Sequence, residues 1–259
     1  MIFYFTGTGN SGHVARELAA RLNDDHLVEM AGALLDDNSR HEVAPGERVG
    51  FVFPTYSWGV PPVVARFLAT LELSGYEPSQ NFLYMVTTCG DDVGRLVDMF
   101  RRQAAASGLT MQAAYSVQMP NTYINMRGFD VDPELLRNAK LHAAQGRIEE
   151  VAQNIAEGRV VVDVREGGWA WLKTRVVYPW FVRHAMSDKK FHVERDKCTH
   201  CGACVGNCPL RNITLNASRE PEWHGNCTMC ESCIHRCPAQ AIQYGRATQH
   251  KGRYHFTHP

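Results

Sequence analysis

The sequence lacks any long uninterrupted apolar run. A membrane-spanning helix needs about 18–20 consecutive apolar residues, whereas the apolar start, Met1–Phe5, runs directly into a glycine turn. That start is typical of a first β-strand and not of a targeting segment. We therefore expect no membrane span and a cytoplasmic location.

An excess of charge of either sign is also absent. The chain has 27 Lys and Arg against 27 Asp and Glu, and nothing in it is typical of a nucleic-acid-binding arm. The balance is uneven, since residues 188–259 carry ten basic against six acidic residues and residues 1–187 carry seventeen against twenty-one. We expect two domains with different surfaces, and the alternative is a basic face that attracts an acidic redox partner.

Two common nucleotide-binding motifs are missing from the first glycine-rich segment, Thr6–Ser11, which reads T-G-T-G-N-S. No Lys follows the glycines as in a Walker loop, and the third glycine of G-x-G-x-x-G is absent. The segment does join an apolar strand to a helix pattern that begins near Asn10, with Val14 and Leu18 four residues apart. Glycine turns, hydroxyls and a helix N-terminus together predict a phosphate-binding loop. The alternative is a tight turn without a ligand.

Strand and helix patterns alternate through the first 160 residues. After the first strand, further strands are expected at residues 26–30, 49–54, 81–88 and 111–118, and helices at 62–71, 91–107 and 133–157. The last helix is expected to have Asp132 as N-cap and Gly158 as C-cap. Five strands alternating with helices predict an α/β fold with a doubly wound, five-stranded parallel sheet. Ligands of such sheets bind at the carboxyl ends of the strands.

Eight of the nine cysteines form two copies of C-x-x-C-x-x-C-x-x-x-C-P, offset by 29 residues. This spacing is typical of two [4Fe–4S] clusters. Zinc sites favour two separated C-x-x-C pairs, and disulfide frameworks suit secreted chains, so both fit less well. Such clusters are oxygen-sensitive, which suggests an anaerobic host. The candidate iron ligands are Cys198, Cys201, Cys204, Cys208, Cys227, Cys230, Cys233 and Cys237.

Three loops resemble those with which flavodoxins bind FMN. Thr6–Ser11 resembles the phosphate loop, Pro54–Gly59 the loop that stacks on the isoalloxazine ring, and Thr88–Asp91 the C-G-D turn beside the pyrimidine. In the second loop we expect a conformationally free Gly59 beside Trp58. The FMN-binding residues implied by this resemblance are Thr6, Gly7, Thr8, Gly9, Asn10, Ser11, Pro54, Thr55, Tyr56, Ser57, Trp58, Gly59, Thr88, Cys89, Gly90 and Asp91.

The flavodoxin pattern is incomplete after the C-G-D turn. Flavodoxins commonly place a second stacking aromatic there, but this chain has Asp92-Val93-Gly94. One flavin face is then open or covered by Tyr123, whose alternative role is to pack under its own loop. Cys89, the ninth cysteine, is expected to be a small buried apolar residue and not a redox group.

Two segments join or follow the expected domains. Residues 169–186 hold three tryptophans, and Trp169, Leu172, Val176 and Trp180 share one helical face. We expect that face to dock the two domains together, and the alternative is binding to a membrane surface. The C-terminal run Gly245–Pro259 is basic and expected to be solvated, with contact to a partner or to the flavin domain as the alternative.

The chain as a whole resembles the flavodoxin–ferredoxin fusion proteins of anaerobic bacteria, sometimes called ferrodoxins. The resemblance implies a flavodoxin-like domain at 1–165, an aromatic helical linker at 166–189 and a small α+β ferredoxin domain at 190–259. It also implies crossed ligand sets, in which each motif lends its last cysteine to the other cluster. One set is then Cys198, Cys201, Cys204 and Cys237, and the other is Cys227, Cys230, Cys233 and Cys208.

Two one-electron clusters and a flavin predict an oxidoreductase or electron-transfer flavoprotein. The first hypothesis is a relay between the clusters and FMN that serves a redox partner protein. The second is an FMN-dependent reductase of a small oxidised acceptor, and the third is a redox sensor or interaction module. The sequence does not fix donor, acceptor or direction of electron flow.

Overall fold

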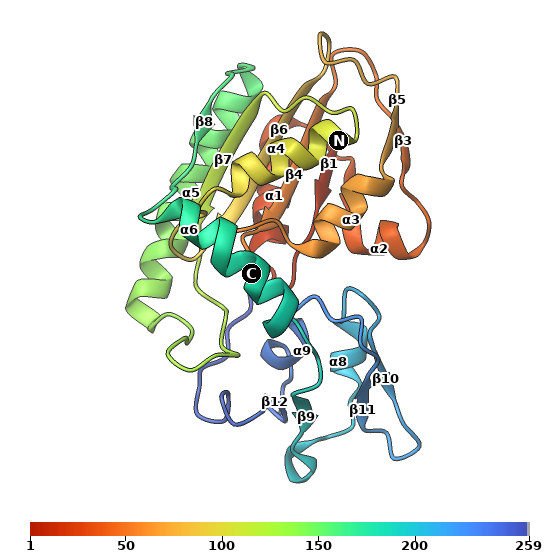
Figure 1. Cartoon of the computed structure of the whole chain (residues 1–259), viewed down its shortest axis with the longest axis vertical. Helices are drawn as coiled ribbons and strands as arrows, with labels where there is room; N and C mark the ends of the chain where they lie inside the picture. The colour runs from red at the N-terminus through yellow and green to blue at the C-terminus, as the bar shows by residue number, and fades with distance from the viewer. Residues whose placement is uncertain (258–259) are drawn as a thin grey trace.

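A six-stranded parallel sheet forms the centre of the larger part of the molecule (Figure 1). This is a computed structural model, and it describes residues 1–257. Across the sheet the strand order is β2-β1-β4-β6-β7-β8, and every neighbouring pair is parallel. The strands are β1 (Ile2–Tyr4), β2 (Leu27–Glu29), β4 (Arg48–Pro54), β6 (Phe82–Cys89), β7 (Ala113–Gln118) and β8 (Val162–Asp163).

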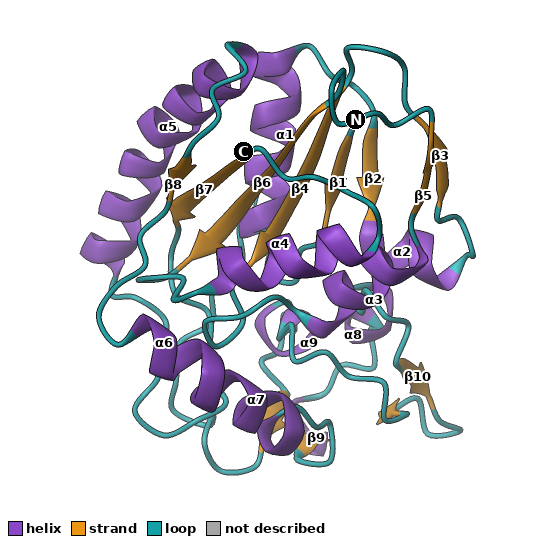
Figure 2. Cartoon of the chain, turned by 45° about the horizontal axis from the view of Figure 1, so that its top comes forward, coloured by secondary structure: helices purple, strands orange, loops and turns teal. Residues whose placement is uncertain are grey.

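Helices cover both faces of this sheet because its strands are apolar on both sides. On one face Phe51 and Phe53 of β4 pack against α2 (Met30–Leu35), α3 (Pro62–Thr70) and α4 (Leu96–Ala106). On the other, Val52 and its neighbours pack against α1 (Asn10–Leu22) and α5 (Glu134–Ala156). Figure 2 shows α4 crossing in front of the strands and α1 behind them. The expected doubly wound α/β architecture is confirmed, with one strand more than expected.

Three local differences from the expected elements have clear causes. The sixth strand, β8, follows α5 and pairs only through two residues with β7, too short a stretch to show a period. A side sheet of β3 (Arg40–Glu42) and β5 (Glu72–Ser74) is mostly polar and has only three residues per strand. Helix α4 begins at Leu96 and not near residue 91, because Gly94 turns the chain at a φ of +57°.

The N-cap residue predicted for α5, Asp132, is wrong. Pro133 is the N-cap residue, and the Asp132 carboxylate instead accepts hydrogen bonds from Asn121 and lies 2.7 Å from Lys140 Nζ. Gly158 has a φ of +65° just past the end of the helix. Asp132 thus fixes the loop after β7 and not the helix terminus.

A smaller unit of short strands and helices follows the sheet domain, below it in Figure 1. Strand β9 (Phe191–Val193) pairs antiparallel with β12 (Ile242–Tyr244), and β10 (Ile213–Leu215) with β11 (Pro221–Trp223). Two four-residue helices, α8 (Ala203–Gly206) and α9 (Ser232–His235), lie between them. This unit carries both cysteine motifs. Of the C-terminal tail assigned to it from the sequence, His258 and Pro259 lie outside the described residues.

The helical linker docks by the face opposite to the one expected. It comprises α6 (Ala170–Leu172) and α7 (Tyr178–Trp180), joined and followed by π-helical turns at Lys173–Val177 and Phe181–Ala185. The Thr174 hydroxyl donates to the Trp58 carbonyl (2.7 Å), and the Tyr178 hydroxyl donates to the Val60 carbonyl (2.5 Å).

The expectation that the aromatic face docks the domains is therefore wrong. Trp169, Leu172, Val176 and Trp180 are 42–82 % exposed. Thr174 and Tyr178 occupy the inner face instead. Their hydroxyls pair with backbone carbonyls that would otherwise be buried without a hydrogen bond, which is costly.

The tail is not solvated as expected but crosses back to the sheet domain. The Phe256 N–H donates to the Thr8 carbonyl (2.8 Å), and the Tyr254 hydroxyl donates to Asn10 Oδ1 (3.0 Å). The Phe256 ring also stacks on His13 at 4.1 Å between centroids. The structure thus has the alternative drawn from the sequence, in which the tail contacts the N-terminal sheet domain.

A glycine pair tests the docking of the linker. A Cβ at Gly59 would lie 2.3 Å from the Tyr178 ring, whereas one at Gly146, in the middle of α5, would meet nothing within 4 Å. We expect Gly59→Ala to lower the free energy of unfolding by about 1–3 kcal/mol through overpacking. Gly146→Ala should raise it by about 0.5–1 kcal/mol, because alanine is the better helix former. Urea unfolding followed by circular dichroism measures both, and equal effects of the two would contradict the packing described.

Candidate functional site

A cavity of about 570 Å³ lies at the carboxyl ends of β1, β4 and β6. Its walls come from the sheet domain, the helical linker and the cysteine-rich unit. Fourteen of the sixteen residues proposed for FMN line it: Thr6, Gly7, Thr8, Asn10, Ser11, Pro54, Thr55, Tyr56, Ser57, Trp58, Thr88, Cys89, Gly90 and Asp91. The cavity therefore brings the three loops together at the strand ends where a doubly wound sheet binds its ligands.

The phosphate-type loop presents backbone N–H groups at the start of α1. Gly9, the N-cap, has a φ of +104°, and no acidic residue stands in the first turn of the helix. The first N–H groups of a helix have no intrahelical acceptor, so they can bind an anion. Two polar side chains of the loop already have partners within the protein and are less available to a ligand than expected. Asn10 Nδ2 donates to the Pro120 carbonyl, and the Ser11 hydroxyl is hydrogen-bonded to the Thr88 hydroxyl (2.7 Å).

The loop after β4 makes a tight turn with an unexpected pair of strained residues. Ser57 and Trp58 have φ angles of +44° and +62°, and Tyr56 and Gly59 exchange two backbone hydrogen bonds across them. Gly59 itself does not have a positive φ and does not line the cavity. Its role is close packing against Tyr178, so the expectation that Gly59 supplies conformational freedom is wrong. Gly9 likewise shapes the phosphate loop from outside the cavity wall.

The C-G-D turn is held by the loop after β7. A Cβ at Gly90 would lie 1.6 Å from Asn121 Oδ1, so any larger residue there would displace the Asn121 side chain. Gln118 Nε2 donates to the Gly90 carbonyl (2.8 Å). Cys89 is buried, and burial raises the pKa of its thiol to about 12. A protonated buried thiol is a weak nucleophile, which agrees with its expected apolar role.

Much of the cavity wall was not found from the sequence. The loop after β7 contributes Tyr123 and Phe129, and the linker contributes Trp180 and Phe181. The Tyr123 ring contacts Phe181 edge to face at 5.8 Å. Only Tyr123 was considered, since aromatic residues in a loop carry no period that shows which way they point.

The hydrogen-bond donors of the cavity, and a buried hydroxyl in its wall without a partner among the described residues, fit FMN as a ligand. Among the described residues that line the cavity there is no Lys or Arg, so a phosphate there would be bound by backbone N–H groups and hydroxyls. The buried Tyr123 hydroxyl has no hydrogen-bond partner among the described residues, which is unusual for a buried polar group and leaves a donor for a ligand. FMN, when bound, would accept one or two electrons.

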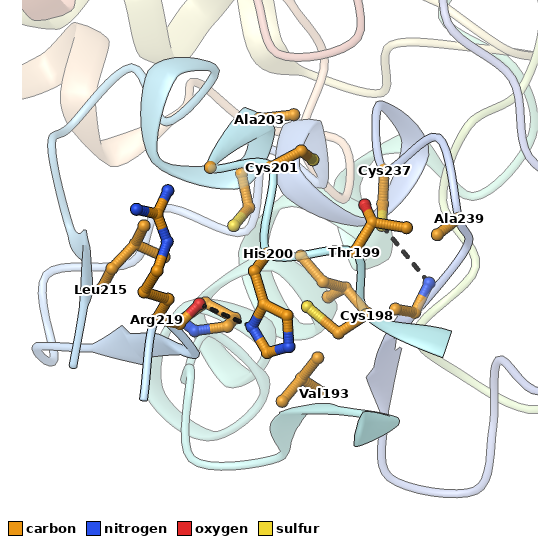
Figure 3. A pocket seen from close by; sticks show the side chains of 15 residues that line it. Val193, Cys198, Thr199, His200, Cys201, Ala203, Leu215, Arg219, Cys237 and Ala239 are labelled. Atoms are coloured by element: carbon orange, nitrogen blue, oxygen red, sulfur yellow. Dashed lines mark hydrogen bonds between the residues drawn. The ribbon is translucent and has the colours of Figure 1, made fainter. Parts of the chain in front are cut away.

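The eight motif cysteines divide into two sets of four, each lining its own hollow. Cys198, Cys201, Cys204 and Cys237 line the first, which we name the distal hollow (Figure 3). Cys208, Cys227, Cys230 and Cys233 line the second, the proximal hollow. These are the crossed sets that the ferredoxin resemblance implies. The ligand assignment itself remains a prediction.

Backbone N–H groups point at three of the sulfurs. Asn212 N–H donates to Cys208 Sγ at 3.3 Å, Met229 N–H to Cys227 Sγ at 3.4 Å and Ala241 N–H to Cys237 Sγ at 3.3 Å. The last bond is visible in Figure 3. Such bonds stabilise thiolates and tune the potential of an iron–sulfur cluster.

Burial favours the protonated thiols in the proximal hollow. It raises the pKa of Cys227 to about 12 and that of Cys233 well above its usual value. A buried thiol becomes a thiolate when a metal cation replaces its proton. The four cysteines around this hollow, with N–H donors to Cys208 and Cys227, form a candidate ligand set for a [4Fe–4S] cluster.

Cys230 belongs to both the proximal hollow and the large cavity. Its carbonyl oxygen would lie 2.3 Å from a Cβ at Gly7, so the two loops touch backbone to backbone. The neighbouring Glu231 is buried, and its carboxylate accepts a hydrogen bond from the Ile124 N–H. His235 Nε2 is hydrogen-bonded to the Thr122 carbonyl (2.7 Å). These contacts fix the proximal hollow against the wall of the cavity.

Comparison with known proteins identifies part of this arrangement. Residues 189–210, which include the first cysteine motif, match the 4Fe–4S binding domain family. No curated protein sequence matches the chain.

Among solved structures, azoreductase AzrA has a TM-score of 0.38 at 11 % identity, over 60 % of this chain and 99 % of that one. An azoreductase from Bacillus anthracis str. Sterne has 0.37 at 12 %, over 60 % and 97 %. Rubredoxin oxygen:oxidoreductase from Desulfovibrio gigas has 0.35 at 18 %, over 62 % and 36 %.

Alkylation tests the burial of Cys89. With a pKa of about 12, only about one thiol in ten thousand is ionised at pH 8, against about a quarter of free cysteines. We expect iodoacetamide to modify Cys89 in the cluster-loaded protein at least a thousandfold more slowly than free cysteine. The rate should rise about tenfold per pH unit, since the thiolate is the reactive form. Peptide mass spectrometry measures it, and labelling at the rate of a free thiol would refute the buried position.

Proposed function

We propose that this chain is an iron–sulfur flavoprotein that relays electrons between an external redox partner and FMN through two [4Fe–4S] clusters. The observation that carries the proposal is the position of Cys230, which lines the proximal hollow and the cavity at once. A cluster held there would share a wall with the flavin. The match of residues 189–210 to a 4Fe–4S binding domain supports the iron–sulfur part.

The residues of each site have separable tasks in this proposal. Cys201, the exposed cysteine of the distal hollow, marks the side from which a partner protein would exchange electrons. The buried Cys233 and its neighbours hold the inner cluster away from water. In the cavity, Gly7 lets the Cys230 backbone approach, and the N–H groups at the start of α1 hold the phosphate. Each cluster would pass single electrons and FMN would take one or two.

Composition is the first test of this function. Anaerobically purified protein should contain about eight iron, eight acid-labile sulfide and one FMN per chain. Iron without flavin would favour the third hypothesis, a cluster-based sensor or interaction module. Iron in the amount of a single mononuclear site would contradict the assignment of both hollows.

Coupling between the centres is the second test. After flash photoreduction, the cluster and flavin absorbance changes should share one rate constant in the wild type and in Gly146→Ala, which lies outside the cavity and both cysteine sets. Cys208→Ser, which removes a thiol from the proximal hollow only, should slow that shared phase at least about a hundredfold. Independent changes of the two centres in the wild type would contradict a relay.

A second function, direct reduction of a small acceptor, has one observation in its favour. Met126, Phe129 and Trp180 line the cavity and are also 36–52 % exposed, so part of the wall is open to solvent. Reduced protein that is reoxidised by small acceptors without any partner protein would support this function. Reoxidation only by another redox protein would support the carrier.

A further inference from the structure

The outward side of the helical linker exposes several large apolar side chains. Leu172, Val176 and Trp180 follow one another at a spacing of four, which makes them neighbours on a helix, and they are 42 %, 50 % and 52 % exposed. Trp169 and Trp171, at the start of the same segment, are 82 % and 64 % exposed. We name these five residues the aromatic face. Large apolar side chains gathered on an exposed surface are typical of interaction sites.

The aromatic face is rigidly presented and not a loose segment. Thr174 on the opposite side accepts a hydrogen bond from the Arg95 N–H (2.8 Å) and donates to Trp58. Lys173 pairs with Asp92 at 2.7 Å and lies 5.0 Å from the centre of the Trp58 ring. Because these bonds hold the inner side of the helix, the outer side cannot turn inward to bury its tryptophans.

The charges on this segment are of one sign. Between residues 167 and 187 the chain has Lys173, Arg175 and Arg183 and no Asp or Glu. Arg175 and Arg183 are exposed and lie beside the apolar row, in the parallel row of spacing four. Glu166, the acidic residue just before the segment, pairs with Arg95 at 3.3 Å. The exposed surface therefore combines tryptophans with Arg175 and Arg183, neither of which forms an ion pair within residues 1–257.

We propose that the aromatic face binds the surface of an anionic lipid bilayer. Tryptophan favours the boundary between acyl chains and headgroups, because its apolar ring can contact the acyl chains while its N–H is hydrogen-bonded to water or headgroups. Arginine beside it can bury its aliphatic stem and keep the guanidinium among lipid phosphates. Each such cation strengthens attachment to anionic lipids about fivefold.

The attachment is to the surface and not across the bilayer. In residues 1–257 no helix is long and apolar enough to cross a membrane. The adjacent loop residues Met126 and Phe129 are also exposed, and together with Trp180 they line the cavity. Bound in this way, the protein would turn the open part of the cavity wall toward the lipid.

Vesicle flotation with the cofactor-loaded full chain tests the proposal. We expect wild-type protein to float with vesicles of phosphatidylcholine and phosphatidylglycerol and to bind vesicles of pure phosphatidylcholine much more weakly. About 0.5 M NaCl should weaken the binding, because salt screens the attraction. Trp169→Gln with Trp171→Gln should lower the partition coefficient at least about tenfold. Arg175→Gln with Arg183→Gln should lower it about twentyfold on anionic vesicles.

A matched control removes exposed apolar side chains elsewhere. Leu135 and Val160 are 87 % and 75 % exposed and lie at the two ends of the α5 region. Leu135→Gln with Val160→Gln should float like the wild type. Iron content and flavin absorbance equal to the wild type show that each variant is folded, and none of these substitutions touches the cavity wall.

Two results would overturn the proposal. One is wild-type protein that stays with the unbound fraction for both kinds of vesicle. The other is a wild-type dimer in sedimentation that the tryptophan variant converts to monomer without any change in vesicle binding, since the face would then be covered by a second copy of the chain.

Discussion

The backbone contact between Gly7 and Cys230 is the constraint on which the rest of the structure depends. A side chain at residue 7 would separate the loop that follows β1 from the loop that carries the inner cysteines. The contact places a candidate phosphate site and a candidate iron site on the two sides of one thin wall. Glu231 and His235 lock that wall to the loop after β7 through its N–H and carbonyl groups. The tail closes it from outside through Phe256.

Features that leave a pattern in neighbouring residues of the chain could be predicted from the sequence. Cysteine spacing is local, so the motifs at Cys198 and Cys227 already implied two sets of four, and the structure gathers those thiols around two hollows. Alternating strands and helices gave the parallel sheet because both of its faces are apolar. The short strand β8 was missed, since two residues show no period. The start of α4 was predicted about five residues too early, because Gly94 turns the chain before the helix begins.

The errors of prediction concern contacts between distant segments. A helical pattern tells which residues share a face but not which face is turned inward, and at the linker the hydroxyls of Thr174 and Tyr178 decide this by pairing with backbone carbonyls. Gly59 was expected to supply backbone freedom, whereas its partner is a ring 119 residues away in the chain, Tyr178. The contacts of the tail likewise have no local signal.

The central claim is that an iron–sulfur cluster and a flavin share the wall formed by Cys230. Electron paramagnetic resonance of partly reduced protein tests it most directly, because a nearby paramagnetic cluster accelerates the relaxation of a flavin radical. We expect a flavin signal that saturates only at high microwave power in the wild type and saturates readily in Cys208→Ser. A wild-type flavin radical that saturates like an isolated one, with both clusters present and reduced, would contradict the account.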